Sequence, residues 1–352
     1  MSRATSDRAW ESDDRPHRFA VEALGAVLAA AFLFWFVAPA ARAQTANEEP
    51  FSEPIQSTSV AVNIYAIVQG RRGQLIGGLT KDDFELTENA IGQRIEHFSP
   101  QTDAALSLGV AIDTSPSQEH LLAIEQGAAK KFLQSVLQAG DQAFVMNFDV
   151  DVKLLRDFTN APAELAKAVD SAQINETGRS VLSPHAAATG GTHLYDAVFL
   201  ASNELMKARL GRKVLVLVTD GEDQGSRISL EASIESAEKA DVIVYSIVVS
   251  DTEYYTLMGS SYHGGARVRK LARETGGSTF RVRSMDQIGT AFEQVARELR
   301  AQYLLGFSPS NLRGDGSFRR IQVRVRGHNY VVRTRAGYYD QSPRQTTTPG
   351  GR

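Results

Sequence analysis

The 352-residue sequence contains no cysteine, which excludes a disulfide framework and thiol chemistry. It also lacks a strong excess of either charge: the net charge is −3, and no basic patch indicates nucleic-acid binding. Common catalytic motifs are missing as well, among them a G-x-S-x-G elbow, an H-E-x-x-H zinc motif and a G-x-G-x-x-G turn after the first strand. A Ser-His-Asp triad stays open, because its members need only be close in space. These absences favour a protein that is not an enzyme.

The N-terminal region contains an uncharged segment, residues 23–41, which follows the arginines at positions 3, 8, 15 and 18. Ala41-Arg42-Ala43 then forms a small-x-small cleavage site before Gln44. The pattern predicts a secretory signal peptide over residues 1–43 and a mature protein that begins at Gln44. The alternative is an uncleaved anchor, since the segment just reaches the roughly 18 residues that span a bilayer. In both cases we expect an exported protein, either periplasmic, in the cell envelope or secreted.

The regions next to this segment and at the other end of the chain are rich in short strand patterns. Residues 44–57 are polar, and we predict a linker there. Residues 58–98 and 302–339 each alternate apolar and polar side chains between turns. Because each region is too small to be stable alone, we predict that they form one discontinuous β-sandwich. Residues 340–352 are polar and are predicted to be a disordered tail.

Residues 104–300 alternate strand and helix patterns, which predicts an α/β fold with a doubly wound, mostly parallel sheet. The pattern at 150–156 favours a hairpin partner at the edge of that sheet. Expected strands cover 106–112, 143–148, 150–156, 213–219, 242–249 and 278–282, and expected helices cover 118–138, 194–209, 229–240, 266–275 and 285–300, with another beginning at Pro162. The buried face of the first helix is expected to comprise Leu121, Ile124, Ala128, Phe132 and Val136.

A carboxylate and two hydroxyls follow the first strand of this unit, as Asp113, Ser115 and Ser117. Ligands of open α/β sheets bind at the carboxyl ends of the strands, where these side chains are expected. Oxygen ligands of this kind suit Mg²⁺, Mn²⁺ or Ca²⁺ rather than zinc. The simpler alternative is a strand end followed by a helix cap, because Ser and Asp are favoured caps.

The D-x-S-x-S pattern of Asp113, Ser115 and Ser117 resembles the metal-ion-dependent adhesion site of von Willebrand factor type A domains. That family adds a threonine and a second aspartate from two later loops. Thr192, after a Gly-Gly pair, and Asp220, at the end of an apolar strand, occupy the matching places. The resemblance implies that the three hydroxyls contact the ion, with Mg²⁺ expected, and that the two aspartates act largely through water.

Three sequence motifs outside the α/β region extend the resemblance. Residues 78–84 (GLTKDDF), 303–309 (YLLGFSP) and 335–339 (RAGYY) resemble a bacterial, exported VWFA-related family. The similarity then covers roughly residues 58–339. It implies a discontinuous β domain beside the type A domain, while the function of that family is poorly specified.

Other polar residues near the expected site have two interpretations each. Asp223 is either a hydrogen-bond partner of the site or part of a solvated turn. His193 is expected at the rim, and Asp149 and Asp151 are expected in an exposed hairpin. The tyrosine-rich loop 250–265 is either a binding rim or an ordinary surface loop.

Three functions are compatible with these features. The first is an exported binding module that holds a partner protein through the metal ion, with an Asp or Glu of the partner completing its coordination. The second is a scaffold component of a cell-envelope assembly in which the ion stabilises the fold. A metal-assisted enzyme is the least favoured, because no general base is evident. Contact with a membrane is expected only if the N-terminal segment stays uncleaved.

Overall fold

The computed structural model describes residues 61–100, 104–175, 191–249, 264–311 and 313–342. All described residues belong to one unit, which lies within Ser57–Arg352. The predicted signal peptide, the start at Gln44, the linker and the tyrosines of loop 250–265 lie outside the described residues. Within the described part of the chain, no helix is long and apolar enough to cross a membrane.

A six-stranded sheet with the order β10-β9-β8-β5-β6-β7 organises the α/β region. Every residue of β5, β8 and β9 is buried, as expected for parallel strands covered on both faces. The edge strand β7 pairs antiparallel with β6, which agrees with the predicted hairpin partner. The strands are β5 (Leu106–Asp113), β6 (Gln142–Phe148), β7 (Val152–Thr159), β8 (Arg212–Thr219), β9 (Val242–Val249) and β10 (Thr279–Val282).

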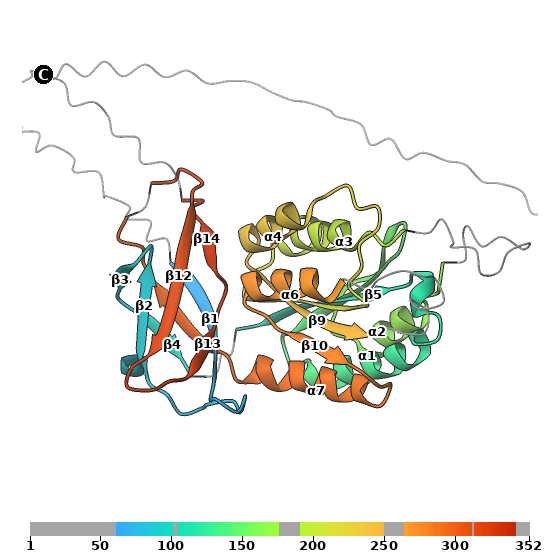
Figure 1. Cartoon of the computed structure of the whole chain (residues 1–352), viewed down its shortest axis with the longest axis horizontal. Helices are drawn as coiled ribbons and strands as arrows, with labels where there is room; N and C mark the ends of the chain where they lie inside the picture. Colours follow the sequence, from blue (N-terminus) through green and yellow to red (C-terminus); the bar gives the residue numbers. More distant parts are fainter. Residues whose placement is uncertain (1–60, 101–103, 176–190, 250–263, 312, 343–352) are drawn as a thin grey trace, which may run out of the picture. The chain divides into compact units, whose positions relative to one another are not determined.

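Helices cover both faces of this sheet, as Figure 1 shows. One apolar core joins the sheet to α1, α2 and α7, and the other joins it to α3, α4 and α6. The predicted doubly wound α/β fold is therefore confirmed. The helices are α1 (Leu122–Val136), α2 (Pro162–Asp170), α3 (Leu194–Leu200), which continues as the π-helical η3 (Ala201–Met206), α4 (Leu230–Lys239), α6 (Gly264–Thr275) and α7 (Gln287–Arg300).

Helix α1 differs from its prediction in its start and in its buried face. It begins four residues late, because Pro116 opens a separate 3₁₀ turn, η2 (Pro116–Gln118). Ile124, expected in the core, is 38% exposed, whereas Glu125 is 1% exposed. The sheet selects a neighbouring stripe of the helix at the same i, i+3, i+4 spacing. Its buried members are Leu122, Glu125, Ala129, Phe132, Leu133 and Val136.

The two flanks of the chain combine in two four-stranded sheets with the orders β13-β1-β11-β4 and β14-β12-β2-β3. Each sheet takes strands from both flanks, and one apolar core that includes Ile64, Leu86, Leu305 and Val323 joins the two sheets. The strands are β1 (Val62–Gln69), β2 (Phe84–Glu88), β3 (Ile91–Gln93), β4 (His97–Ser99), β11 (Tyr303–Phe307), β12 (Phe318–Val325), β13 (Val331–Arg333) and β14 (Gly337–Tyr339), with the 3₁₀ turn η1 (Lys81–Asp83) before β2.

The ordered structure continues past Tyr339, where the predicted sandwich ends. Asp340 is buried, and its Oδ2 accepts hydrogen bonds from the N–H groups of Arg313 and Gly314. The same oxygen accepts a bond from the Arg319 side chain at 2.9 Å. Asp340 thus ties the end of the sandwich to the loop before β12.

Candidate metal centre

Asp113 is the last residue of β5 and is completely buried. Its Oδ1 accepts a hydrogen bond from the Ser115 N–H (2.9 Å), and its Oδ2 accepts one from the Thr219 hydroxyl (2.6 Å). Burial raises the pKa of Asp113 to about 8, and the nearby Asp220 carboxylate contributes to the rise. Two carboxyl groups that disfavour each other's charge would be stabilised by a cation between or near them.

The adjacency of β5 and β8 brings the two aspartates together. The strands are parallel, with Ile112 opposite Val218, so their carboxyl ends lie at the same edge of the sheet. Asp113 follows Ile112 directly, and Thr219 and Asp220 follow Val218. Strand pairing therefore accounts for the hydrogen bond between Thr219 and Asp113, which are 106 positions apart in the sequence.

The two serine hydroxyls lie in front of these carboxylates. Ser115 Oγ is 3.1 Å from Ser117 Oγ, and Ser117 donates to Asp220 Oδ2 at 2.6 Å. The exposed fractions rise from 0–1% for Asp113 and Asp220 to 3% for Ser115 and 9% for Ser117. The hydroxyls are thus nearer the surface, and the carboxylates stand behind them.

Asp220 accepts hydrogen bonds from Ser117, Gln118 and the backbone of Glu222. Its Oδ2 accepts from Ser117 and from Gln118 Nε2 (3.0 Å), and its Oδ1 accepts from the Glu222 N–H (3.0 Å). Sequence reasoning missed Gln118 and also Thr219, the partner of Asp113. Thr219 carries a sequence signal, a hydroxyl at the end of an apolar strand directly before an aspartate, whereas Gln118 carries none.

Thr192 is fixed by the backbone of its loop. Its N–H and C=O exchange hydrogen bonds with Gln224, both at 2.9 Å, and the next N–H, of His193, donates to the Asp149 carbonyl at 2.7 Å. A Cβ on Gly191 would lie 2.3 Å from the Gln224 carbonyl oxygen, so only glycine permits this approach. The Thr192 loop therefore lies against the loop that follows Asp220.

Two further aspartates hold the Thr192 loop and the Asp220 loop together. Asp223 Oδ1 accepts from the Tyr195 N–H (3.2 Å) at the start of α3, and Asp196 Oδ1 accepts from the Ile228 N–H (2.9 Å). Burial raises the pKa of Asp223. Asp223 is half-buried, and its hydrogen bonds among the described residues go to Tyr195 and Ser226 rather than to any of the five predicted metal-site residues.

Asp149 corrects the prediction of an exposed hairpin. It is 2% exposed, because it follows β6 directly beside the end of β5, while Asp151 is exposed as expected. The Asp149 carboxylate accepts from the Thr114 hydroxyl (2.8 Å) and from the Asn175 side chain (2.8 Å). Asp149 thereby fixes Thr114, which lies between Asp113 and Ser115.

The serine pair has a geometry that suits a small divalent ion. Mg²⁺ binds oxygen at about 2.0–2.1 Å, so ligands at right angles in its octahedron lie roughly 3 Å apart. The 3.1 Å between Ser115 Oγ and Ser117 Oγ matches that spacing. Within the described ranges, no group of three or more His, Asp or Glu side chains is placed to hold an ion.

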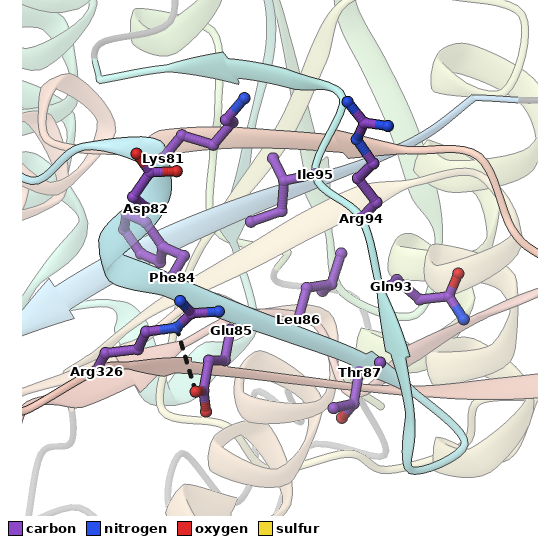
Figure 2. A pocket seen from close by; sticks show the side chains of 11 residues that line it. Lys81, Asp82, Phe84, Glu85, Leu86, Thr87, Gln93, Arg94, Ile95 and Arg326 are labelled. Carbon is purple, nitrogen blue, oxygen red and sulfur yellow. Dashed lines mark ion pairs between the residues drawn. The ribbon is translucent and has the colours of Figure 1, made fainter.

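A separate pocket of about 490 Å³ lies in the β-sandwich, away from these loops. Figure 2 shows it between β2 and the chain that leaves β3, with the ion pair between Glu85 and Arg326 at one side. Its lining includes none of the five predicted metal-site residues.

Comparison with known proteins gives one family match and several solved structures of low sequence identity. Residues 108–222 match the family model of the von Willebrand factor type A domain, and no curated protein matches the chain. One similar solved structure is described as von Willebrand factor type A from Catenulispora acidiphila, with 14% identity over 81% of this chain and 74% of that chain and a TM-score of 0.47.

Two other solved structures match a smaller share of this chain. An aerotolerance-related membrane protein from Bacteroides fragilis has 17% identity, covers 55% of this chain and 100% of its own, and has a TM-score of 0.41. Proximal thread matrix protein 1 from the mussel byssus, described with a zinc-occupied MIDAS motif, has 15% identity and a TM-score of 0.42, and covers 60% of this chain and 50% of its own. These similarities assign no residue role and no partner to this chain.

The family match begins within β5 and ends two residues after Asp220. It therefore includes the D-x-S-x-S loop, Thr192 and Asp220, on a doubly wound sheet that places the two aspartates at one edge. The chain thus contains a von Willebrand factor type A domain, as its sequence pattern predicted.

Proposed function

We propose that this chain is an exported binding module that holds a partner protein through a divalent ion, with Ser115, Ser117 and Thr192 as hydroxyl ligands. The observation that carries the proposal is the serine pair, whose oxygens are 3.1 Å apart in front of two buried aspartates. Mg²⁺ is the ion favoured by this donor set, and Mn²⁺ or Ca²⁺ would also accept it.

The partner would supply an acidic side chain. Both aspartates already accept hydrogen bonds from protein donors, which favours their action through water or through the hydroxyls. Neutral hydroxyls donate little charge to the ion, so it keeps affinity for an incoming carboxylate. An Asp or Glu of the partner would then displace a water and complete the coordination.

A pull-down from envelope extract of the source cells tests this function. The intact protein should capture its partner in Mg²⁺, lose it in EDTA and recover it when Mg²⁺ is restored. Ser117→Ala should abolish capture, whereas Asp151→Ala, which removes an exposed carboxylate near the same edge of the sheet, should not. Capture that survives EDTA, or that survives Ser117→Ala, would refute the proposed role of the ion.

The second candidate function is a scaffold in which the ion only stabilises the fold. It is favoured by the burial of the two aspartates, since an ion near them would offset an unfavourable charge pair. Thermal unfolding with Mg²⁺ and with EDTA distinguishes the two functions when combined with the pull-down. A large shift of Tm without ion-dependent capture would favour the scaffold.

A further inference from the structure

Glu125 is a buried carboxyl group that the candidate site does not yet explain. It lies in the first turn of α1 and is 1% exposed. In the described part of the protein, neither Oε1 nor Oε2 has a hydrogen-bond partner. A buried carboxylate without a partner is strongly disfavoured, whereas the neutral acid costs less and offers one O–H donor.

The charges around Glu125 also favour its neutral form. Burial raises the pKa of Glu125 well above its usual range, and the carboxyls of Asp113 and Asp220 raise it further. Helices α2 and α7 pack against α1, but among the described residues neither brings a cation that offsets these two carboxyls. Burial and these two carboxyls therefore both favour the protonated form of Glu125, whose O–H would need an acceptor.

Gln118 has an acceptor of the required kind. Its Nε2 donates to Asp220 Oδ2 (3.0 Å) and to Ser117 Oγ (3.3 Å). Gln118 is fully buried, and its Oε1 has no partner among the described residues. The amide cannot be reversed, because Oε1 would then face the Asp220 carboxylate.

Backbone hydrogen bonds place Gln118 and Glu125 on the same side of one continuous helical segment. The Leu121 N–H donates to the Gln118 carbonyl (2.9 Å), and the Glu125 N–H donates to the Leu121 carbonyl (3.0 Å). Positions 118 and 125 are thus two helical turns apart and share a face. Asp220 is near both, since it bonds Gln118 and acts on the charge of Glu125.

We propose that Glu125 is a neutral carboxylic acid whose O–H donates to Gln118 Oε1 and so holds Gln118 Nε2 on Asp220 and Ser117. Glu125 is then a positioning residue for the metal centre, and it never touches the ion. This role rests on the proposed function, but the protonation of Glu125 does not. Hydrogen bonds that orient metal ligands typically change metal affinity by about 10–100-fold when they are lost.

The protonation is tested in the intact protein without metal. NMR of protein labelled with ¹³C at the glutamate side-chain carboxyl carbon, in EDTA at neutral pH, should show a signal from Glu125 with the shift of a protonated acid. That signal should vanish in Glu125→Gln and remain in Asp113→Asn. A Glu125 signal with the shift of a carboxylate would overturn the proposal.

The positioning role is tested by the affinity of the same chain for Mn²⁺. Glu125→Gln keeps a donor and should bind within about threefold of wild type, whereas Glu125→Leu should lose about 10–100-fold. Gln126→Leu is the matched control, because the Gln126 amide on the same helix bonds the Val169 and Ala172 carbonyls instead. Its Mn²⁺ affinity should stay at the wild-type level.

A double variant identifies the acceptor. If Glu125 acts through Gln118, adding Glu125→Leu to Gln118→Leu should cause no further loss of affinity, and independent losses would overturn the proposal. Asn147 Oδ1 is another buried amide oxygen without a partner in the described chain, but its amide holds Thr114. Coupling to Asn147→Leu instead of Gln118→Leu would also refute the assignment.

Failure of this inference is distinguishable from failure of the proposed function. If Glu125→Leu binds Mn²⁺ with wild-type affinity, Glu125 has no positioning role, but the metal site stands. If the wild-type protein binds no Mn²⁺, the proposed function itself fails.

Discussion

At the scale of single residues, Asp113 links the metal centre to pH. Within the described structure it has no cationic partner, and its hydrogen bonds come from the Ser115 N–H and the Thr219 hydroxyl. Asp113 is completely buried, so its truncation to alanine would leave a cavity. An isosteric change, Asp113→Asn, is therefore the better probe. Because the Asp113 carboxylate would attract a nearby ion only in its deprotonated form, ion binding should strengthen as pH rises.

The stability of the ion-free protein should fall as pH rises from about 4 to about 8 because of Asp113. The pKa of Asp113 is raised from 3.8 in its usual state to about 8 in the folded protein, so the folded state holds the proton more tightly. The stabilisation is complete below the lower pKa and is lost as pH passes the upper one. Urea unfolding in EDTA across this range measures it. The free-energy difference between wild type and Asp113→Asn isolates Asp113, and a difference that grows in favour of wild type with pH would contradict the assignment.

Thr219→Val should weaken Mn²⁺ binding by about 10–100-fold, because the Thr219 hydroxyl orients the Asp113 carboxylate. Calorimetric titration with Mn²⁺ measures the change. Thr279→Val is the matched control, since the buried hydroxyl of Thr279 has no partner among the described residues. Equal affinity in both variants would show that Thr219 does not support the site.

At the scale of elements, the sequence was most informative where strands are buried on both faces. Apolar segments predicted β5, β8 and β9, and each ends where a polar residue or turn begins. The faces of α1 were harder to predict, because two overlapping stripes of that helix have helical spacing. The buried stripe contains a charged residue, Glu125, so the sequence favoured the neighbouring stripe that contains Ile124. In the structure Ile124 is exposed and Glu125 is buried.

In the candidate site too, some residues could be predicted from the sequence and others could not. The D-x-S-x-S spacing after a strand singled out Asp113, Ser115 and Ser117, and the family resemblance added Thr192 and Asp220; the ion itself stays a proposal. The supporting contacts of Gln118, Thr219 and Asp149 were not predicted, because they depend on which strands are neighbours. In the chain, elements that include α1, β6, β7, α2 and α3 lie between β5 and β8, so no local pattern shows that Thr219 reaches Asp113.

Gly191→Ala should disrupt the Thr192 loop. The added Cβ would lie 2.3 Å from the Gln224 carbonyl oxygen and would break the paired hydrogen bonds of Thr192. We expect a loss of Mn²⁺ affinity similar to that of Thr192→Ala and a destabilisation of about 1–3 kcal/mol from the unpaired backbone groups.

Gly127→Ala is the control for Gly191→Ala. It lies within α1 with no atom within 4 Å of the added Cβ, so the change should stabilise the protein by about 0.5–1 kcal/mol and leave Mn²⁺ affinity unchanged. Thermal unfolding and calorimetry measure both variants. A Gly191→Ala protein with wild-type affinity would show that the loop does not need its present conformation.

At the scale of the whole molecule, the two flanks of the chain depend on each other. β1 pairs with β11 along Val62 to Ala66, and β2 pairs with β12 along Phe84 to Glu88. Both sheets would therefore lose strands if either flank were removed. The type A domain is inserted between these flanks, and α7 is followed directly by β11.

Asp340→Asn should destabilise the sandwich strongly. The Asp340–Arg319 ion pair is buried, with side chains 1% and 6% exposed, and removing one partner of such a pair typically costs about 3–5 kcal/mol. Glu85→Gln is the control, since the Glu85–Arg326 pair is largely exposed and should contribute less than about 1 kcal/mol. Urea unfolding compares the two variants, and equal losses would indicate that the Asp340 pair is not buried in solution.

The central claim is that Asp113, Ser115, Ser117, Thr192 and Asp220 form one divalent-ion site. Titration of the intact protein with Mn²⁺, followed by electron paramagnetic resonance of the free ion, tests it most directly. We predict one bound ion for wild type and for Asp151→Ala, and none for Asp220→Ala at the same concentrations. Failure of wild type to bind Mn²⁺, or an unchanged bound ion in Asp220→Ala, would contradict the account.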